Sequence, residues 1–346
     1  MVLATGGLGY IGSHTCIDLI SEGYDVLILD SLINSPINNL EKIKKIININ
    51  KKNIRGKLTF QKGDLKDKKW LDSIFKKQIL LKKPIESVIH FAGLKSVQES
   101  VLQPLRYWEE NINATLSLIS VMEENNCRNI VFSSSATIYK PILGFKLTED
   151  SIKEPINPYG NSKLAIEKIF HDVYNLNKNW KIINLRYFNP VGVHNSANIG
   201  EVQLGTVTNL FPILEKVVSC KLDRLMIYGK DWPTFDGTCV RDYIHVMDLS
   251  RAHLAALKYI KENDPQFISI NIGTGKGLSV LQIINAYSKI NNVNIPFEFV
   301  NRRVGDTPYL VADNSLALEL LDWKPLKSIE DICADSFRFI KENQNF

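Results

Sequence analysis

The stretch 1–30 constrains the fold of this chain more than any other. A short apolar run at 2–5 is followed by the glycine-rich loop 6–12 (GGLGYIG), a helical apolar pattern over 13–21 and a second apolar run over 24–29 that ends in Asp30. Strand, glycine loop, helix, strand and acid together make up the βαβ unit that binds dinucleotides. The glycines let a pyrophosphate approach the backbone at a helix N-terminus, where unpaired N–H groups favour anions.

Two acidic residues refine the predicted ligand. Asp30 would accept a hydrogen bond from an adenosine ribose hydroxyl, and it would repel a 2′-phosphate. The next residues, Ser31, Leu32 and Ile33, carry no cation that would offset this repulsion. The sequence therefore predicts NAD rather than NADP. Asp64, at the end of a strand-like run over 59–65, is expected where this fold can cover the adenine.

The alternation of strands and helices continues to about residue 190. Further apolar runs lie at 87–93, 129–132 and 181–186, with a helical pattern over 111–122. We interpret His90, which lies inside one of these runs, as a core histidine. The pattern predicts an α/β fold with a Rossmann-type, doubly wound parallel sheet. We predict an NAD-binding domain over 1–189 and a smaller mixed α/β C-terminal substrate lobe over 190–346, allowing for later segments that return to the first domain.

Composition excludes several classes of protein. The chain has 346 residues, of which 45% are apolar, and a net charge of only +5, so a nucleic-acid partner is not indicated. One basic cluster is interpreted as a solvated helix and loop, because no aromatic residues accompany it: Lys42, Lys44, Lys45, Lys51, Lys52, Arg55 and Lys57.

Cysteines and apolar runs bear on the cellular setting. The five cysteines are scattered and never spaced CxxC, which predicts neither a disulfide framework nor a zinc site. No apolar run approaches the ~20 residues of a membrane span, and a signal peptide is not expected before the first strand. We therefore expect no membrane contact and a reducing, cytoplasmic setting.

Tyr159 and Lys163 are the candidate catalytic pair. They stand four residues apart at the start of a helical pattern, so phenol and ammonium share one helix face. A free phenol ionises near pH ~10, and a cation beside it favours the phenolate. Such a pair also occurs on ordinary exposed helices. What favours proton transfer is its combination with the dinucleotide unit and with hydroxyls at 133–135, which follow a buried strand where ligands bind in this fold.

Several strings, in order, resemble the UDP-glucose 4-epimerases, which are extended short-chain dehydrogenases/reductases. They are TGGLGYIGSHT, HFAGLKSVQESV, FSSSATIY, PYGNSK, LRYFNPVG, DGTCVRDYIHVMDL and RRVGDTPYLVAD. The first and fourth are shared by the wider superfamily, and the others are narrower. The resemblance covers nearly the full length. It implies NAD-dependent interconversion of UDP-glucose and UDP-galactose in galactose metabolism, and a homodimer formed by helices near 105–122 and 164–176.

The resemblance also implies a mechanism. The C4–H bond of the sugar is not acidic, so inversion at C4 requires transient oxidation to a 4-keto sugar. Tyr159 would take the proton of the 4-hydroxyl, and Lys163 would lower the phenol pKa and bind the nicotinamide ribose. Ser135 would hydrogen-bond the reacting oxygen and the phenol.

Cofactor and substrate contacts follow residue by residue from the matching strings. Cofactor contacts are implied for Gly6, Gly9, Tyr10, Ile11, Gly12, Asp30, Asn34, Ser35, Asp64, Leu65, Phe91, Ala92, Gly93, Lys95, Asn111, Ser133, Tyr159, Lys163 and Phe188. Substrate contacts are implied for Lys95, Ser135, Tyr159, Asn189, Asn209, Leu210, Arg241, Arg303 and Asp306. The two guanidinium groups suit a pyrophosphate, and a firmly held nucleotide leaves the keto sugar free to turn.

Three positions depart from the family pattern. Lys140 replaces a glycine behind the serine loop, and Glu110 stands where a polar cofactor contact is common. Leu310 occupies the position of an aromatic gate, with Tyr309 one place earlier. A smaller gate would admit N-acetylated sugars, so an epimerase acting also or mainly on UDP-N-acetylhexosamines is the alternative function.

Other functions remain open at this point. A nucleotide-sugar 4,6-dehydratase needs an acid and a base, typically carboxylates, beside Ser135, where this chain has Ala136 and Thr137. A non-catalytic NAD-binding scaffold has no need of Tyr159 and Lys163 together. A net-oxidising dehydrogenase would accumulate NADH, whereas an epimerase would not.

Overall fold

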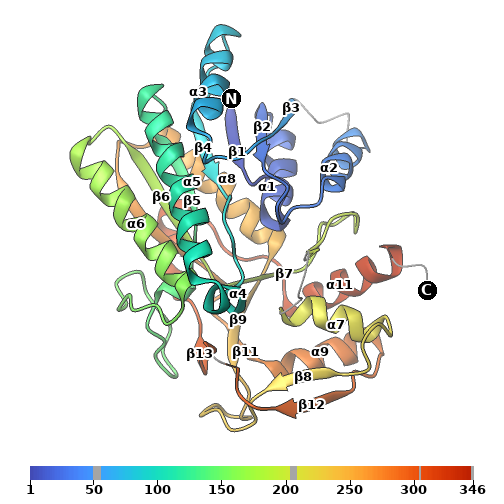
Figure 1. Cartoon of the computed structure of the whole chain (residues 1–346). Coiled ribbons are helices and arrows are strands. Elements are labelled where there is room, and N and C mark those ends of the chain that lie inside the picture. The colour runs from blue at the N-terminus through green and yellow to red at the C-terminus, as the bar shows by residue number, and fades with distance from the viewer. Residues whose placement is uncertain (50–55, 203–208, 304, 344–346) are drawn as a thin grey trace.

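A seven-stranded parallel sheet forms the centre of the structure, a computed structural model that describes residues 1–49, 56–202, 209–303 and 305–343 (Figure 1). The strand order is β10-β6-β5-β4-β1-β2-β3. The strands are β1 (Val2–Thr5), β2 (Val26–Asp30), β3 (Leu58–Lys62), β4 (Ser87–His90), β5 (Asn129–Ser135), β6 (Lys181–Tyr187) and β10 (Phe267–Ile272). β1, β2 and β4 are buried along their whole length, because helices cover both faces.

Two layers of helices enclose this sheet. One layer contains α1 (Tyr10–Ser21), α2 (Asn38–Ile49) and α8 (Val246–Glu262), and the other contains α3 (Lys68–Leu80), α5 (Pro104–Glu124) and α6 (Pro158–Leu176). Each layer has its own apolar core, formed with one face of the sheet. The predicted doubly wound α/β fold is confirmed.

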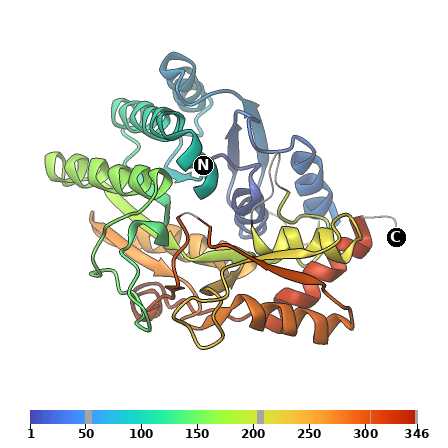
Figure 2. The same ribbon diagram turned by 60° about the horizontal axis from the view of Figure 1, so that its bottom comes forward.

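The smaller lobe is built around short strands. β9 (Val240–His245) pairs with β7 (Asn189–Val191), β11 (Gly277–Ser279) and β13 (Tyr309–Leu310), and β8 (Leu225–Tyr228) pairs with β12 (Phe297–Val300). The helices α7 (Leu210–Val218), α9 (Val280–Asn291) and α11 (Ile329–Asn343) share an apolar core with these strands. Figure 2 brings this lobe forward. The remaining helices are α4 (Val97–Leu102), the 3-10 turn η1 (Ala136–Ile138) and α10 (Ser315–Leu321).

Some segments beyond residue 190 belong to the first sheet. β10 extends the sheet beside β6, and α8 packs against α1. The division at 189 and 190 stays a prediction. Several element boundaries also differ from the sequence expectations: α1 begins at Tyr10 rather than at 13, so Gly12 is helical, and α5 is longer than the predicted 111–122.

Two sequence predictions concern surface properties. Of the basic cluster, Lys44, Lys45 and Lys57 are exposed and Lys42 is partly buried, while Lys51, Lys52 and Arg55 lie outside the described residues. Over the described part of the chain, none of the helices combines the length and the apolar character needed to cross a bilayer.

Candidate active site

The predicted cofactor residues gather at one edge of the sheet because parallel strands end there together. Gly6 follows β1, Asp30 ends β2, Phe91 follows β4, Ser135 ends β5 and Phe188 follows β6. His90, just before this edge, is fully buried between Thr5 and Thr115 hydroxyls, and burial lowers its pKa to about 3. The prediction of a core histidine is confirmed.

The glycine loop forms a tight cradle at the start of α1. Gly6 has a φ of 66°, and a Cβ on it would lie 2.7 Å from Ala92 N; a Cβ on Gly12 would lie 2.6 Å from Gly6 O. Only glycine fits such contacts. No side chain of the described residues caps the α1 N-terminus at Gly9, which leaves N–H groups of the first turn suited to an anion.

Asp30 is held in place beneath this cradle. Its carboxylate accepts hydrogen bonds from Leu8 N at 3.0 Å and Leu32 N at 2.9 Å, and it is also bonded to Ser35. Burial raises the Asp30 pKa, and these hydrogen bonds oppose the rise. No lysine or arginine appears among these partners, which agrees with the predicted preference for NAD.

Glu110 proves to have a partner at the adenine end of the predicted cofactor site. The Lys66 ammonium donates to Glu110 Oε1 at 2.7 Å and lies 3.7 Å from Asp64 Oδ2. The Asp64 carboxylate also accepts from Lys66 N at 2.9 Å. Glu110 departs from the family pattern, and its negative charge is paired with Lys66 of the same chain.

Asn111 ties the segment after β4 to α6. Its side chain accepts from Leu94 N at 2.7 Å, and it donates to Leu94 O at 3.2 Å and to Ser162 Oγ at 3.0 Å. A Cβ on Gly93 would lie 3.9 Å from Lys163 Nζ, so the loop passes directly over the ammonium. Asn111 thus has a structural role beside its predicted contact with a cofactor.

Lys163 and Tyr159 lie near the start of α6. The Asn157 side chain caps this helix by accepting from Gly160 N at 2.8 Å. The Lys163 ammonium donates to Ser133 O at 2.7 Å and lies 5.8 Å from the centre of the Tyr159 ring. The structure therefore brings Tyr159 and Lys163 together with the serines 133–135 at the end of β5.

Burial moves the pKa values of this pair apart, because it disfavours both the phenolate and the ammonium. It raises the Tyr159 pKa to about 12, with the Ser135 hydroxyl opposing the rise. It lowers the Lys163 pKa to about 7, with the Glu167 carboxylate opposing the fall. Burial is therefore the largest influence on the Tyr159 pKa, and the lowering of that pKa by Lys163 stays a prediction.

Phe188 and Leu310 meet beside the serine loop. Phe188 is buried in a small apolar cluster with Ala136 and Ile138 of η1, and Leu310 packs against the same cluster. Because β13 pairs with β9, Leu310 also lies opposite Arg241 in the ladder. The predicted gate residue therefore connects the region of Phe188, a predicted cofactor contact, with that of Arg241, a predicted nucleotide contact.

Three of the predicted anchor residues, Arg241, Arg303 and Asp306, lie in one region of the second lobe. Arg303 makes a two-point ion pair with Asp306, with Nε–Oδ2 at 3.1 Å and Nη2–Oδ1 at 2.9 Å. The charges of Arg241, Arg303 and Asp306 all act on the Cys239 thiol, which shows that the three side chains share one region. The guanidinium groups of Arg241 and Arg303 can together hold a pyrophosphate.

An aromatic ring that the sequence analysis missed lies in the same region. The Arg303 guanidinium lies 5.1 Å from the centre of the Tyr228 ring at the end of β8. An aromatic face next to a guanidinium is a suitable platform for a planar base. In the sequence, Tyr228 belongs to the ordinary apolar run LMIY, and this pattern gave no indication of a role in binding.

Glu201, also missed, joins two predicted substrate residues. Its Oε1 accepts from Lys95 Nζ at 2.8 Å and from Asn209 Nδ2 at 2.9 Å. Lys95 follows β4 in the first sheet, and Asn209 begins α7 in the second lobe, so the carboxylate bridges the two sides of the site. Asn189 lies nearby in the chain on β7, and its Oδ1 is buried with no partner among the described residues.

The remaining predicted residues lie around the cradle or in the core. Tyr10 is buried and donates to Gly192 O at 2.6 Å, which links α1 to the segment after β7. Asn34 is exposed, Ile11 packs on the core of the α1 layer, and Leu65 and Leu210 pack in apolar cores. Leu65 and Leu210 can therefore offer a ligand mainly their backbone.

Lys140 disturbs the serine loop less than its replacement of a glycine suggests. Its side chain is exposed and pairs with Glu154 at 2.8 Å, while its N–H donates to Ile152 O at 2.8 Å. Behind Ser135, the Thr137 hydroxyl donates to Ser135 Oγ at 2.9 Å. The loop thus keeps a regular hydrogen-bonded shape with a lysine at this position.

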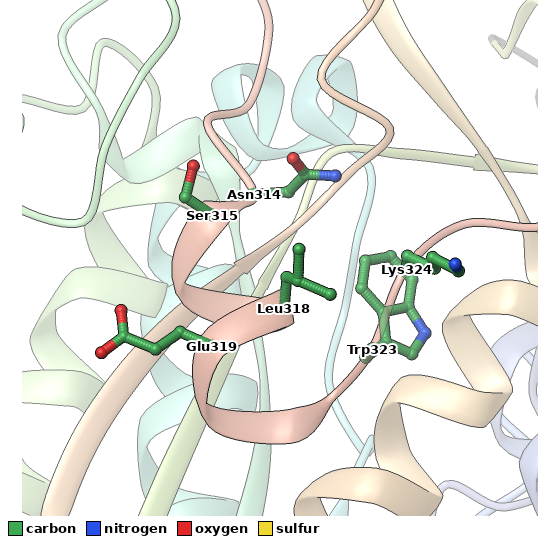
Figure 3. Close-up of a pocket in the computed structure, with 6 residues that line it drawn as sticks. All are labelled: Asn314, Ser315, Leu318, Glu319, Trp323 and Lys324. Atoms are coloured by element: carbon green, nitrogen blue, oxygen red, sulfur yellow. The ribbon is translucent and has the colours of Figure 1, made fainter.

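A separate cavity of about 330 Å³ lies beside α10 (Figure 3). It is lined by Asn314, Ser315, Leu318, Glu319, Trp323 and Lys324. None of the predicted site residues lines it, and the Trp323 indole N–H already donates to Asp248 O at 2.9 Å. It is therefore not part of the candidate active site.

Comparison with known proteins gives consistent matches. The sequence profile of the family described as GDP-mannose 4,6 dehydratase matches residues 3–336. A UDP-glucose 4-epimerase of Bacillus subtilis is 43% identical over 99% of this chain and 98% of its own length.

Solved structures agree with this result. The UDP-glucose-4-epimerase of Stenotrophomonas maltophila, with bound NAD and formylated UDP-arabinopyranose, is 39% identical with a TM-score of 0.92, and covers 99% of this chain and 98% of that one. The UDP-glucose 4-epimerase of Bifidobacterium longum, in complex with NAD+ and UDP, is 40% identical with a TM-score of 0.91, and covers 99% of each chain.

Proposed function

The chain belongs to the UDP-glucose 4-epimerases, within the extended short-chain dehydrogenases/reductases, and on that premise we propose that it interconverts UDP-glucose and UDP-galactose. The observation that carries the proposal is the placement of Tyr159 and Lys163 on α6 directly against the serine strand. A binding protein of this fold would not need a buried phenol and ammonium at the reactive end of a dinucleotide site. The activity would serve galactose metabolism.

The residues around the glycine loop fit NAD. Gly6 and Gly12 leave no room for a Cβ, and the α1 N-terminus has no capping side chain. Asp30 is fixed beneath them by two backbone N–H groups, in a position to bind the adenosine ribose. When bound, NAD supplies an oxidised nicotinamide that takes up the C4 hydride and whose positive charge lowers the phenol pKa.

The chain's own residues then carry the proton. Tyr159 takes the proton of the sugar 4-hydroxyl and returns it after the 4-keto sugar has turned over in the site. Ser135 is held beside the phenol by Thr137 and can donate to the reacting oxygen. Lys163 keeps positive charge beside the phenol when it is protonated, which is required because burial otherwise raises the Tyr159 pKa to about 12.

The second lobe would hold the nucleotide while the hexose turns. Arg241 and Arg303 suit the diphosphate, Tyr228 offers its ring to the uracil, and the Asn189 Oδ1, which has no partner in the described part of the chain, offers an acceptor to the substrate. A 4,6-dehydratase is disfavoured because the residues after Ser135 are a buried alanine and a threonine, neither of which can act as an acid. The names of the relatives favour plain hexoses over N-acetylated sugars as the main substrates.

We also propose that the protein forms a homodimer through the outer face of α5 and α6. These helices lie side by side, and α5 exposes Leu105 (81%), Trp108 and Leu116. A groove of about 410 Å³ runs past Leu105 and Trp108, and exposed apolar surface of this kind is typical of an interface. Leu105→Glu should therefore shift the protein to a monomer in sedimentation velocity, whereas Leu326→Glu, at an exposed leucine outside α5 and α6, should not.

A reducing, cytoplasmic setting is proposed from the thiols. All five cysteines are free, and four of them are buried. Buried thiols of this kind suit a compartment in which disulfides do not form.

Product analysis tests the function. The protein is incubated with UDP-galactose, with and without added NAD, and the nucleotide sugars are separated while NADH absorbance is followed. The proposal predicts UDP-glucose with no steady accumulation of NADH. Accumulated NADH would instead indicate a net-oxidising dehydrogenase, and a 4-keto-6-deoxy product would indicate a dehydratase.

A further inference from the structure

A buried ion pair lies directly behind the proposed catalytic pair. Glu167 on α6 and Arg186 on β6 are 4% and 3% exposed. Arg186 Nη2 donates to Glu167 Oε2 at 2.7 Å, and Nε donates to Oε1 at 3.0 Å. Burying two charges is costly even when they are paired, so their position next to the site requires an explanation.

Glu167 and Lys163 fasten α6 to β5 at consecutive strand residues. Lys163 donates to Ser133 O at 2.7 Å, and the Ser134 hydroxyl donates to Glu167 Oε1 at 2.5 Å. The two side chains are one helical turn apart on the same face. Glu167 therefore fixes the register in which α6 presents Lys163 and Tyr159.

Glu167 is also the charge that opposes the burial of Lys163. Other groups near the ammonium are neutral: the Tyr159 phenol on α6, the His90 ring on β4 and the Phe132 ring on β5, whose centre lies 4.7 Å from Nζ. Arg186 binds the far side of the carboxylate and donates onward to the Tyr139 hydroxyl at 2.7 Å and to Glu149 O at 3.0 Å. Arg186 therefore holds Glu167 in place for Lys163.

We propose that Glu167 is a positioning residue for the epimerase reaction, whose carboxylate keeps the Lys163 ammonium charged and docked on β5 so that Tyr159 works at neutral pH. This inference rests on the proposed function, since it assigns Glu167 to the same site. It follows that loss of the Glu167 charge changes the pH at which the phenol ionises, rather than the binding of the nucleotide sugar.

Glu167→Gln is the direct test, because glutamine keeps the shape and can still accept from Ser134. Without the carboxylate, Lys163 loses its proton at a lower pH, so the phenolate is less favoured at neutral pH. The rising limb of the kcat–pH profile should move to higher pH by about one unit. The KM for UDP-galactose should change little. Tyrosinate absorption, measured against the matching Tyr159→Phe protein, should show the same upward shift without any substrate.

Three further proteins separate charge from structure. Ser134→Ala removes the hydrogen bond but keeps the charge, so the limb should stay in place. Glu167→Asp keeps a carboxylate and should bring the limb back toward the wild type. Glu167→Gln combined with Arg186→Gln removes both members of the buried ion pair, so neither is left behind as a lone charge. It should show the same shift even if Glu167→Gln alone does not fold.

The contrary results are equally specific. A limb that stays in place in folded Glu167→Gln or in the double variant overturns the proposal, as does a loss of kcat that is equal at every pH. A wild type that does not turn over UDP-galactose refutes the proposed function instead. In that case the tyrosinate titration still decides whether Glu167 controls the pair.

Discussion

The two sides of the candidate site are built in different ways. On the reacting side, Lys163 and Ser135 are buried and Tyr159 is partly buried, and they lie on α6 and at the end of β5, with backbone partners close by. On the anchoring side, Arg303 and Asp306 lie between short strands and are partly exposed, and each binds the other. Proton transfer requires fixed geometry, whereas a diphosphate can be held by charges that exchange one partner for another. The difference predicts effects on kcat for one side and on KM for the other.

The largest effect should come from Tyr159→Phe. Loss of the proton acceptor should lower kcat by about 10²–10⁴-fold, with the KM for UDP-galactose nearly unchanged. The Tyr107 ring lies 6.4 Å from that of Tyr159, and its hydroxyl instead bonds Ser96 N and Glu99. Tyr107→Phe is therefore the matched control and should keep most activity. Steady-state kinetics on both proteins tests this prediction. If Tyr159→Phe keeps most of its activity, Tyr159 is not the base.

Arg303→Lys tests the anchoring side. Lysine keeps the charge but loses the planar two-point contact, so the KM for UDP-galactose should rise about tenfold to a hundredfold while kcat changes less than threefold, on the scale of a lost charged hydrogen bond. Arg302 is the neighbouring control, because it is exposed and bound to Asp231 at 2.9 Å. Arg302→Lys should leave KM unchanged. A fall in kcat at constant KM for Arg303→Lys would mean that the two sides are not separate.

The same contrast explains what the sequence could predict. The glycine loop, Asp30 and the pair on α6 are local patterns, because their spacing alone sets their geometry. Tyr228 and Glu201 act through partners far away in the chain, Arg303 and Lys95, and no local spacing reveals such pairs. The raised pKa of Tyr159 was also not predictable, since desolvation depends on the whole surrounding fold.

Glu215 provides a stability test in the second lobe. Burial raises its pKa from 4.5 to about 8, with the charge of Glu201 adding to the rise, and the Ser336 hydroxyl donates to it at 2.8 Å. Between about pH 4.5 and pH 8, Glu215 therefore keeps its proton in the folded protein but has lost it in the unfolded chain. Stability falls as pH rises through this window, and the loss is complete above the folded pKa.

Glu215→Gln should remove this dependence because glutamine does not titrate. Its free energy of unfolding should exceed that of the wild type by about 1–3 kcal/mol above pH 8 and by much less near pH 5, as measured by urea unfolding. Glu298→Gln, at an exposed carboxylate paired with Arg224, is the control and should show no such gap. A Glu215→Gln protein that is less stable than the wild type at high pH would show that the carboxylate is needed there in its charged form.

The smallest effect on the main reaction is expected from Leu310→Tyr, which tests whether the two sides meet at this residue. Leu310 packs on the cluster of Phe188 and η1 and pairs with Arg241 across the ladder, so we predict that its size limits the space for the hexose. The kcat/KM for UDP-galactose should change by less than about threefold, while any turnover of UDP-N-acetylgalactosamine should fall about tenfold or more because the larger ring takes the space of the acetamido group. Tyr309→Phe removes only the neighbouring hydroxyl and should alter neither sugar. If the wild type converts UDP-galactose alone, Leu310 does not open the site to N-acetylated sugars, and the limit on sugar size must come from residues on the reacting side.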